Sequence, residues 1–214
     1  MSNGETGELA VAVETGPIEK AAVELVVVTF FENDRPLRGE AGRVDWRLCG
    51  MLSDLLVRGA LRGSGGEAAL IPTFGRLRAP RVLVLGLGSA TGFGALEVKS
   101  MARAAVQRCA GLRVRSIALA LPGHWTGLLP VGPCAAAVLR GTVAGLKETG
   151  AALRMRLVVP EGSAARALGG LETAVRQLPD GEVTVKLAGV EPLSVLSAPG
   201  LRDELEGASP APPR

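Results

Sequence analysis

Residues 81–94, RVLVLGLGSATGFG, begin with a run of branched apolar residues and end in a segment that contains four glycines. An apolar run of this kind, bounded by glycine, is typical of a central strand covered on both faces. The segment after it then forms a loop at the carboxyl end of the strand, where open α/β sheets usually bind ligands. The sequence therefore predicts an α/β fold and a candidate site in this loop.

The chain after this loop alternates between helical and strand patterns. Helical spacing or β-rich runs predict, in order, a helix at 96–110, a strand at 114–121, a helix at 133–147, a strand at 152–159 and a helix at 164–177. This order requires parallel crossovers, so the helices must cover both faces of a sheet. Gly141 and Gly145 in the second helix are expected to permit its close approach to that sheet.

The chain before the loop adds further strands. The patterns predict strands at 8–14, 22–31 and 67–74 and one long helix at 40–58. Residues 75–80 have the length of a hairpin connection, so the strands on either side of them are expected to pair antiparallel. We therefore expect a three-layer α/β/α fold with a mixed sheet of about six strands, and residues 182–187 are a candidate edge strand.

Composition favours one folded domain. Of the 214 residues, 47% are hydrophobic and 21% charged, which predicts a globular body over 8–190. Residues 1–7 and the proline-rich 191–214 are expected to be disordered. No apolar stretch approaches the roughly 20 residues of a membrane span, and no secretory signal is visible. We expect a cytoplasmic protein without a membrane partner.

Charge gives little support to a nucleic-acid partner. The net charge is only +3, although residues 98–146 contain several basic residues and no Asp or Glu. Aromatic residues make up 3% of the chain, so rings on which bases could stack are scarce. These features leave nucleic-acid binding as a weak alternative, and the basic residues are otherwise read as solvated surface.

The reactive side chains do not form a recognisable catalytic set. Cys49, Cys109 and Cys134 are far apart among apolar neighbours, which predicts buried free thiols rather than disulfides or a metal site. His124 is the only histidine, so any mechanism with two imidazoles is excluded. It is read either as a solvated side chain or as part of a pocket near the end of the sheet.

Acidic residues likewise suggest no metal centre. Asp45 and Asp54 lie nine residues apart on one predicted helix, which puts them on opposite faces, and both are expected to be surface charges. Ser89 has no acid or base partner that the sequence identifies, so covalent catalysis is not predicted. We expect neither a metal nor a cofactor.

The candidate ligand-binding residues are those of the glycine-rich loop, namely Gly86, Gly88, Ser89, Thr91, Gly92 and Gly94. The segment has two glycines of the dinucleotide fingerprint but Thr91 in place of the third, and no acidic residue lies between Glu97 and Glu148. A Rossmann-type NAD site is therefore not predicted. Two interpretations stay open: backbone amides that cradle a phosphate or the pyrophosphate of ADP-ribose, or glycines required only for a tight turn.

A series of short segments resembles one known family. The segments are ELAV at 8–11, IEK at 18–20, VVV at 26–28, Trp46 with LS at 52–53, GGE at 65–67, GR at 75–76 and RVLVLGLG at 81–88. In this order they resemble the N-terminal domain of the cytosolic leucyl aminopeptidases, the dizinc M17 family, over about residues 8–178. The resemblance implies a macro-domain-like α/β/α fold.

The same resemblance implies that the catalytic part of the family is missing. In the family, the two metals and the catalytic lysine and arginine belong to a C-terminal domain with a motif like Asn-Thr-Asp-Ala-Glu-Gly-Arg, and these 214 residues contain no such segment. No catalytic residue carries over to this chain, and we expect no enzymatic activity because metal-assisted hydrolysis needs those ligands.

Three functions follow as expectations. The first is a non-catalytic interaction module that associates with itself or with a full-length aminopeptidase, because the family's N-terminal domain helps build its hexamer and shapes access to the active sites. The second is a macro-type module that binds ADP-ribose or another nucleotide at residues 86–94, with Asp34 or Asp45 holding the adenine. The third and weakest is DNA binding, which some bacterial members of the family show.

Overall fold

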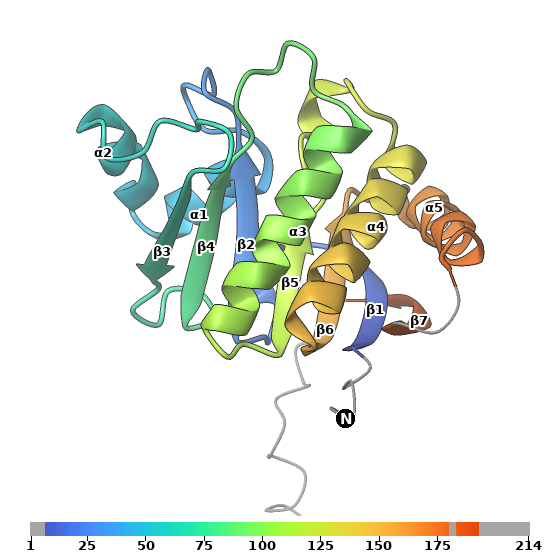
Figure 1. The fold of residues 1–214 in the computed structure, drawn as a ribbon. Coiled ribbons are helices and arrows are strands. Elements are labelled where there is room, and N and C mark those ends of the chain that lie inside the picture. Colours follow the sequence, from blue (N-terminus) through green and yellow to red (C-terminus); the bar gives the residue numbers. More distant parts are fainter. Residues whose placement is uncertain (1–6, 180–182, 193–214) are drawn as a thin grey trace, which may run out of the picture.

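The computed structural model of the chain describes residues 7–179 and 183–192. In chain order the elements are β1 (Gly7–Thr15), the 3₁₀ helix η1 (Ile18–Lys20), β2 (Leu25–Phe30), α1 (Gly39–Arg47), α2 (Met51–Val57), β3 (Ala68–Pro72), β4 (Arg81–Gly86), α3 (Ala95–Gly111), β5 (Ser116–Ala120), the 3₁₀ helix η2 (His124–Thr126), α4 (Val131–Thr149), β6 (Ala152–Val159), α5 (Ala164–Arg176) and β7 (Val183–Pro192) (Figure 1). The terminal segments expected to be disordered fall almost entirely outside the described residues.

The strands form one mixed sheet in the order β3-β4-β2-β5-β6-β1-β7. As the hairpin connection predicted, β3 and β4 pair antiparallel, and every other neighbouring pair is parallel. The sheet has seven strands rather than about six, because the candidate edge strand forms and extends to Pro192. The first described strand, β1, lies inside the sheet between β6 and β7, the last two of the described strands.

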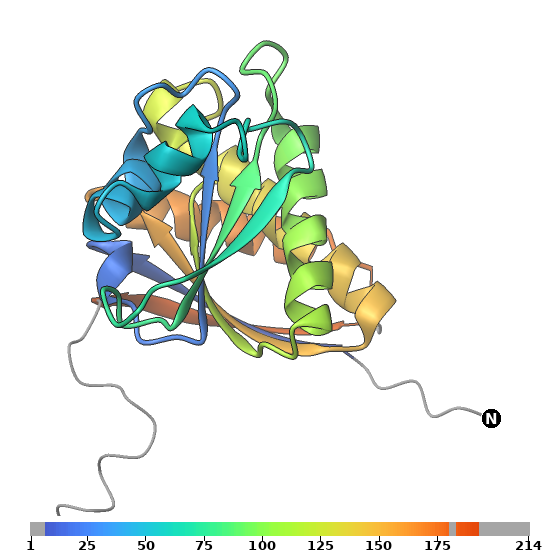
Figure 2. The ribbon, with the colours of Figure 1, turned by 90° about the vertical axis from the view of Figure 1, so that its left-hand side faces the viewer.

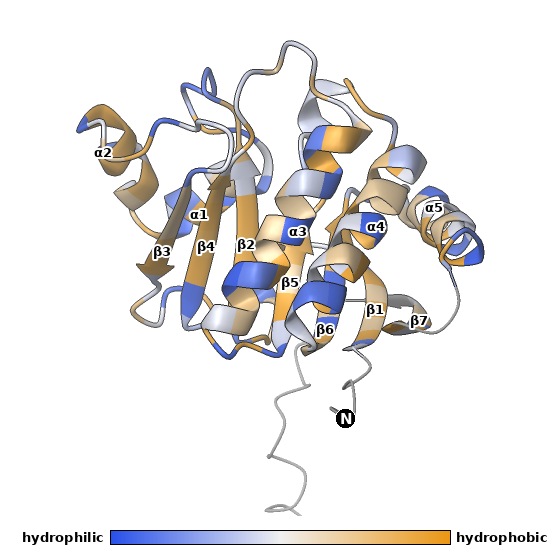
Figure 3. Ribbon diagram, viewed as in Figure 1, coloured by the Kyte–Doolittle hydropathy of each residue, from blue (hydrophilic) through white to orange (hydrophobic). Residues whose placement is uncertain are grey.

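Helices cover both faces of the sheet, so the predicted three-layer fold is confirmed (Figure 2). Successive residues of a strand point to opposite faces. Val26 and Val28 accordingly pack in the apolar core under α1 and α2, whereas Val27 packs in the core under α3, α4 and α5. Because both faces of the central strands are covered by helices, β2, β4 and β5 consist mostly of apolar residues (Figure 3). Helix α3 covers one face only and carries several polar residues as well.

The single helix expected at 40–58 is two helices, α1 and α2. Cys49 and Gly50 adopt left-handed backbone angles, with φ of 58° and 80°, and this conformation ends one helix and begins the next. The apolar spacing continues across the break because both helices turn their apolar residues, among them Val44, Leu48 and Leu52, to the same core. The sequence pattern for that reason did not reveal the break.

The expectation that Asp45 and Asp54 are both surface charges is wrong for Asp45. Its side chain is buried, and its carboxylate accepts the N–H groups of Leu52 at 2.7 Å and Ser53 at 3.1 Å, together with the Ser53 hydroxyl. Asp45 thus caps α2 from the preceding helix. Asp54 is exposed as expected and pairs with Arg58 at 3.0 Å.

The two glycines of α4 permit a close approach, but to α3 and not to the sheet. A Cβ atom on Gly141 would overlap the backbone carbonyl of Lys99, and one on Gly145 would lie 2.8 Å from the Cβ of Val106. These glycines let the backbones of α3 and α4 pack side by side, as Figure 1 shows. The contact at Gly141 and Gly145 therefore sets how closely α3 and α4 pack on this face of the sheet.

The three cysteines divide into two kinds. Cys109 and Cys134 are buried as predicted, and burial raises the pKa of each thiol to about 12. Cys49 is exposed, contrary to the prediction, because it lies in the left-handed turn between α1 and α2. Only Cys49 is therefore accessible in the folded protein.

We expect one of the three thiols to react with Ellman's reagent in the native protein at pH 8, and all three in denaturant. The thiolate is the reactive form, and the raised pKa of Cys109 and Cys134 keeps both protonated at this pH. Absorbance of the released thionitrobenzoate measures the number, and the Cys49→Ser variant should give none under native conditions. A native count of two or three would contradict the described burial.

None of the described helices is long and apolar enough to cross a membrane.

Candidate functional site

The glycine-rich loop follows β4 as predicted, but its first part is packed against the chain itself. A Cβ atom on Gly86 would overlap the backbone carbonyl oxygen of Ser64. The next amide, of Leu87, donates to the carbonyl of Phe30 at 2.9 Å, and that of Gly88 donates to Gly63 at 2.7 Å. These amides are already used within the chain and do not face a ligand.

Gly88 itself needs the conformational freedom of glycine. Its φ is +75°, and a Cβ atom there would lie 3.3 Å from the backbone nitrogen of Gly65. Its carbonyl also accepts the N–H of Glu32 at 3.1 Å. A bulky residue at this position would therefore change stability, so such a substitution cannot separate ligand binding from folding.

The second part of the loop is more open. Ser89, Thr91 and Gly92 are exposed, and the Thr91 amide donates to the Ser89 hydroxyl at 3.1 Å. At the start of α3, the amide of Gly94 donates to the carboxylate of Glu97 at 2.9 Å. Gly86 and Gly88 are thus placed for chain packing, while ligand binding by the exposed part of the loop stays a prediction.

The two carboxylates proposed to hold an adenine are both engaged. Asp34 is buried and accepts the amide of Phe31 at 2.9 Å, which closes the turn after β2. Asp45 accepts the three donors of α2 described above. Each carboxylate therefore has a structural role in its own part of the chain.

Basic residues of the acid-free stretch also have partners within the chain. Arg103 pairs with Glu148 and lowers the pKa of that carboxyl, and Arg108 donates to the carbonyl of Gly66 at 2.9 Å. Arg140 donates to the amide oxygen of Gln177. These contacts leave fewer free cations for a nucleic acid than the sequence suggested.

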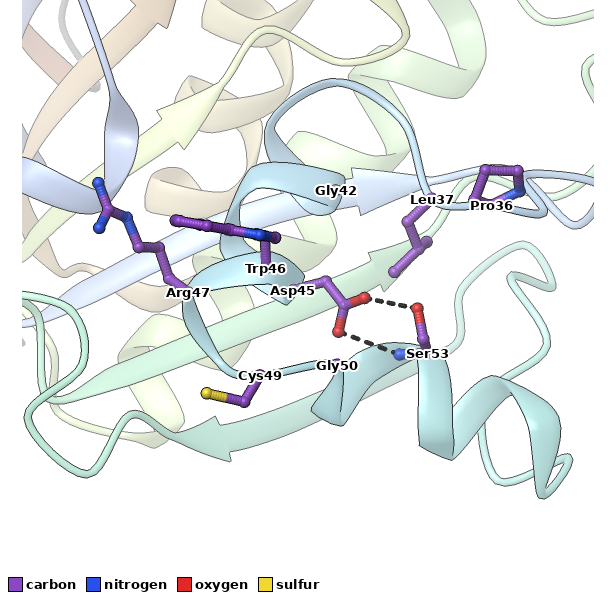
Figure 4. A pocket seen from close by; sticks show the side chains of 9 residues that line it. All are labelled: Pro36, Leu37, Gly42, Asp45, Trp46, Arg47, Cys49, Gly50 and Ser53. Carbon is purple, nitrogen blue, oxygen red and sulfur yellow. Dashed lines mark hydrogen bonds between the residues drawn. The ribbon is translucent and has the colours of Figure 1, made fainter.

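A hollow of about 690 Å³ opens beside the break between α1 and α2 (Figure 4). Its lining consists of Pro36, Leu37, Gly42, Asp45, Trp46, Arg47, Cys49, Gly50 and Ser53. Trp46 is 75% exposed, and the guanidinium carbon of Arg47 lies 5.2 Å from the centre of its ring. The hydrogen bonds from Ser53 to Asp45 link the two helices beside this hollow.

Further apolar side chains are exposed on α2, on β3 and in the turn after β3. Val57 at the end of α2 is 87% exposed, Leu70 in the edge strand β3 is 41% exposed, and Phe74 in the turn after β3 is 69% exposed. Figure 1 shows α1, α2 and β3 together on its left. We call Trp46, Val57 and Phe74 the apolar side. Leu70 is not included, because Ala69 and Ile71 pack in the core under α1 and α2 and Leu70 between them points to the opposite face of the sheet. The helical pattern suggested only that Trp46 covers the margin of its helix, and it gave no signal for the others.

A second hollow, of about 580 Å³, lies at the carboxyl ends of β1 and β6. Its lining consists of Gly16, Pro17, Gly39, Glu40, Arg43, His124, Val159, Pro160 and Glu161. The side chain of His124 is 15% exposed, and its Nδ1 lies 3.0 Å from the carbonyl oxygen of Leu121 and 3.4 Å from Oε2 of Glu40. Of the two interpretations of His124, the structure supports the pocket near the end of the sheet.

The comparison with protein families now identifies the chain. A family model described as the cytosol aminopeptidase family, N-terminal domain, matches residues 26–145, from β2 to the C-terminal part of α4. The chain belongs to this family. The match is to the N-terminal domain alone, as the resemblance in the sequence implied.

Curated relatives of this N-terminal domain are probable cytosol aminopeptidases. That of Alkaliphilus oremlandii is 23% identical over 128 residues, which cover 59% of this chain and 26% of the relative. That of Xanthomonas oryzae pv. oryzae is 42% identical over 74 residues, or 35% of this chain and 15% of the relative. The chain thus spans about a quarter or less of the length of these relatives.

Solved structures share the fold of this N-terminal domain. A macrodomain mutant of Oceanobacillus iheyensis matches with a TM-score of 0.63 and 15% identity, over 78% of this chain and 93% of that one. A Trypanosoma brucei macrodomain in complex with ADP-ribose gives 0.60 and 17%, over 77% and 68%. A mutant of tomato leucine aminopeptidase gives 0.61 and 17%, over 79% and 36%. The macro-domain-like fold is therefore confirmed.

Among the described residues of the domain, no group of three or more His, Cys, Asp or Glu side chains is arranged to hold a metal ion.

Proposed function

We propose that this N-terminal domain is a non-catalytic interaction module that binds a protein through its apolar side. The observation that carries the proposal is Trp46, which is 75% exposed and lines the hollow beside α1 and α2. Tryptophan in such a position is unusual on a free surface and is enriched among the residues that dominate binding energy at interfaces. The match of the chain to the N-terminal domain alone supports a role outside catalysis.

The partners that we propose are a second copy of the chain or a full-length aminopeptidase of the same family, whose assembly or access it would affect. The tomato leucine aminopeptidase carries a domain of this fold within a longer chain, which supports the second partner. Val57 and Phe74 extend the contact beyond the hollow. A cytoplasmic location is part of the proposal, in keeping with the family's description as cytosol aminopeptidases.

The test measures binding of the domain to itself and to the full-length Xanthomonas oryzae aminopeptidase, by light scattering and biolayer interferometry. We expect a complex, and the Trp46→Ala variant should bind about thirtyfold more weakly, which equals about 2 kcal/mol. Its free energy of unfolding should change by no more than about 0.5 kcal/mol because the ring is exposed.

Leu128→Ala is the matched control, since Leu128 is also exposed, at 49%, but lies between η2 and α4, away from the apolar side. It should bind like the original chain. A chain that stays monomeric and binds neither partner would rule out the proposal.

ADP-ribose or another nucleotide is the second candidate ligand. The fold likeness to a macrodomain in complex with ADP-ribose and the exposure of Ser89 and Thr91 favour it. The chain packing around Gly86 and Gly88 counts against it. Calorimetric titration with ADP-ribose tests it directly, and DNA binding ranks below both because arginines of the acid-free stretch already have partners.

A further inference from the structure

The sheet ends at β3 in an edge that has no neighbour on its outer side. Among the described strands, β3 pairs with β4 alone. It lies at the left of the sheet in Figure 1, and Figure 2 views the molecule from that side. Backbone groups that point outward from β3 are therefore available to a strand from outside the chain.

Hydrogen bonds at the two ends of β3 show which residues face β4. The carbonyl of Glu67, just before β3, accepts the amide of Gly86 at 2.9 Å, and the amide of Thr73, just after β3, donates to the carbonyl of Pro80 at 3.0 Å. Hydrogen-bonded pairs alternate along an antiparallel ladder, and the register between these two pairs has no irregularity. The odd-numbered residues of β3 therefore bond to β4, and the even-numbered residues turn their backbone groups outward.

The outward residues of β3, which we call the open edge, are Ala68, Leu70 and Pro72. Ala68 and Leu70 each present an N–H and a C=O group, and Pro72 presents a C=O alone, as is typical for proline in an edge strand. All three residues are exposed. Edge strands are usually protected by charged side chains or by a bulge, and β3 contains neither. The open edge can therefore pair with one more strand.

Arginines follow the open edge at its carboxyl end. Arg76 and Arg78 lie in the hairpin between β3 and β4, both are exposed, and neither makes an ion pair with a described residue. The amide of Arg78 donates to the carbonyl of Glu19 at 3.3 Å, but the carboxylate of Glu19 pairs with Arg47. This end of the open edge therefore has an excess of positive charge.

The amino end of the open edge is also basic. Arg62 is exposed, and Arg108 of α3 donates to the carbonyl of Gly66 at 2.9 Å, two residues before β3. One carboxylate lies here, that of Glu67, which accepts the amides of Arg62 at 2.9 Å and Gly63 at 2.6 Å. Two arginines against one carboxylate leave a positive charge. A segment that is neutral in its middle and acidic at both ends therefore complements the open edge.

We propose that the open edge binds an extended segment of another protein, which pairs with β3 as an additional strand and carries acidic residues at both ends. Backbone hydrogen bonds to Ala68 and Leu70 supply the affinity, and the arginines select the acidic ends. Leu70, which is 41% exposed, contacts an apolar residue in the middle of the segment. A second copy of β3 fits poorly, because its ends are basic as well and like charges would meet in either orientation.

The test follows the backbone amide signals of Ala68 and Leu70 by NMR while a synthetic peptide is added to the full chain. The probe is the peptide DEVTVTED with blocked ends, added up to about 10 mM, which detects dissociation constants in the millimolar range. We expect a saturable shift of both signals. The peptide KKVTVTKK should bind about tenfold more weakly because its end charges are reversed, and DEVPPTED should not bind because its prolines disrupt both edges of the peptide strand.

Variants of the chain assign the two contributions. Leu70→Pro removes an outward N–H that makes no bond to β4, and it should weaken binding of DEVTVTED about tenfold, whereas Leu70→Ala keeps this N–H and should weaken binding only about threefold. Arg76→Gln combined with Arg78→Gln should weaken binding about fivefold. Lys99→Gln combined with Arg176→Gln removes the same charge from exposed positions on α3 and α5 and should leave binding unchanged.

The remaining amide signals show whether Leu70→Pro keeps its fold, and the arginine pair tests the proposal if it does not. The absence of a shift with DEVTVTED would overturn the proposal, as would equal binding of KKVTVTKK or unchanged binding by a folded Leu70→Pro or by the arginine pair. Shifts that appear without peptide as the chain is concentrated would assign the open edge to a second copy and would also overturn it. Trp46 lies on α1 and is not part of the open edge, so Trp46→Ala should bind DEVTVTED like the original chain, and this proposal stands or falls separately from protein binding through Trp46.

Discussion

Replacing Gly86 with alanine is expected to lower the free energy of unfolding by about 3 kcal/mol. A Cβ atom at this buried position would overlap backbone atoms of Gly63 and Ser64, which cannot turn away as a side chain can. Relief of the overlap requires that β4 and residues 63–67 move apart. That movement would break the hydrogen bond from the Gly86 amide to Glu67, which is 2.9 Å long, and the neighbouring one from Gly88 to Gly63.

Urea unfolding followed by tryptophan fluorescence measures this loss as a lower midpoint with an unchanged slope. Gly111→Ala is the control, because nothing lies within 4 Å of a Cβ atom there and Gly111 is helical. Alanine favours helix over glycine by up to about 1 kcal/mol, so this variant should be as stable as the original chain or slightly more stable. An unchanged midpoint for Gly86→Ala would mean that the loop does not pack against residues 63–64 in solution.

Replacing Asp45 with alanine should cost a similar amount, about 3 kcal/mol. The change removes a charged acceptor from three donors and leaves the amide of Leu52 buried without a partner. Helix α2 has only seven residues, and a helix of this length is not stable without tertiary support. We expect α2 to loosen before the rest of the chain unfolds.

Two measurements distinguish local from global effects. The amides of residues 51–57 should exchange faster with deuterium in Asp45→Ala under native conditions, and the melting temperature should fall. Asp54→Ala is the control, since Asp54 makes only an exposed ion pair with Arg58 and such pairs contribute about 0.5 kcal/mol. If Asp45→Ala and Asp54→Ala melted at the same temperature, Asp45 would not be the link between the helices.

Local sequence signals predicted most elements of the fold. Alternating or continuous apolar runs located the strands, and the short connection at 75–80 correctly indicated the antiparallel pair β3–β4. These signals succeed because each depends on neighbours within a few residues. The break between α1 and α2 was not predicted, because both helices pack on one core and the apolar spacing continues across the break. Gly50 was the local signal that indicated the end of the first helix.

The candidate sites were harder to predict because they join distant segments. The glycines at 86 and 88 were predicted as candidate ligand-binding residues, and their packing against residues 63–65 depends on a loop that no periodicity connects to them. Glu40 and His124 come from separate crossovers, and only the parallel sheet brings them within 3.4 Å. Asp45 was misjudged since its burial depends on a turn of the backbone that the helical pattern concealed.

The place of β1 in the sheet has a consequence for synthesis of the chain. Its apolar residues, such as Leu9 and Val11, are synthesised before the other described strands, yet the strands on either side of β1, β6 and β7, are synthesised after those strands. Residues 26–145, the part that matches the family model, contain neither β1 nor those neighbours and end with β5 open on one edge. Completion of the sheet must therefore wait until β6 and β7 have been synthesised, and contacts of such long sequence separation slow folding. Until then the nascent chain presents an unpaired apolar strand, which is the kind of segment that chaperones protect.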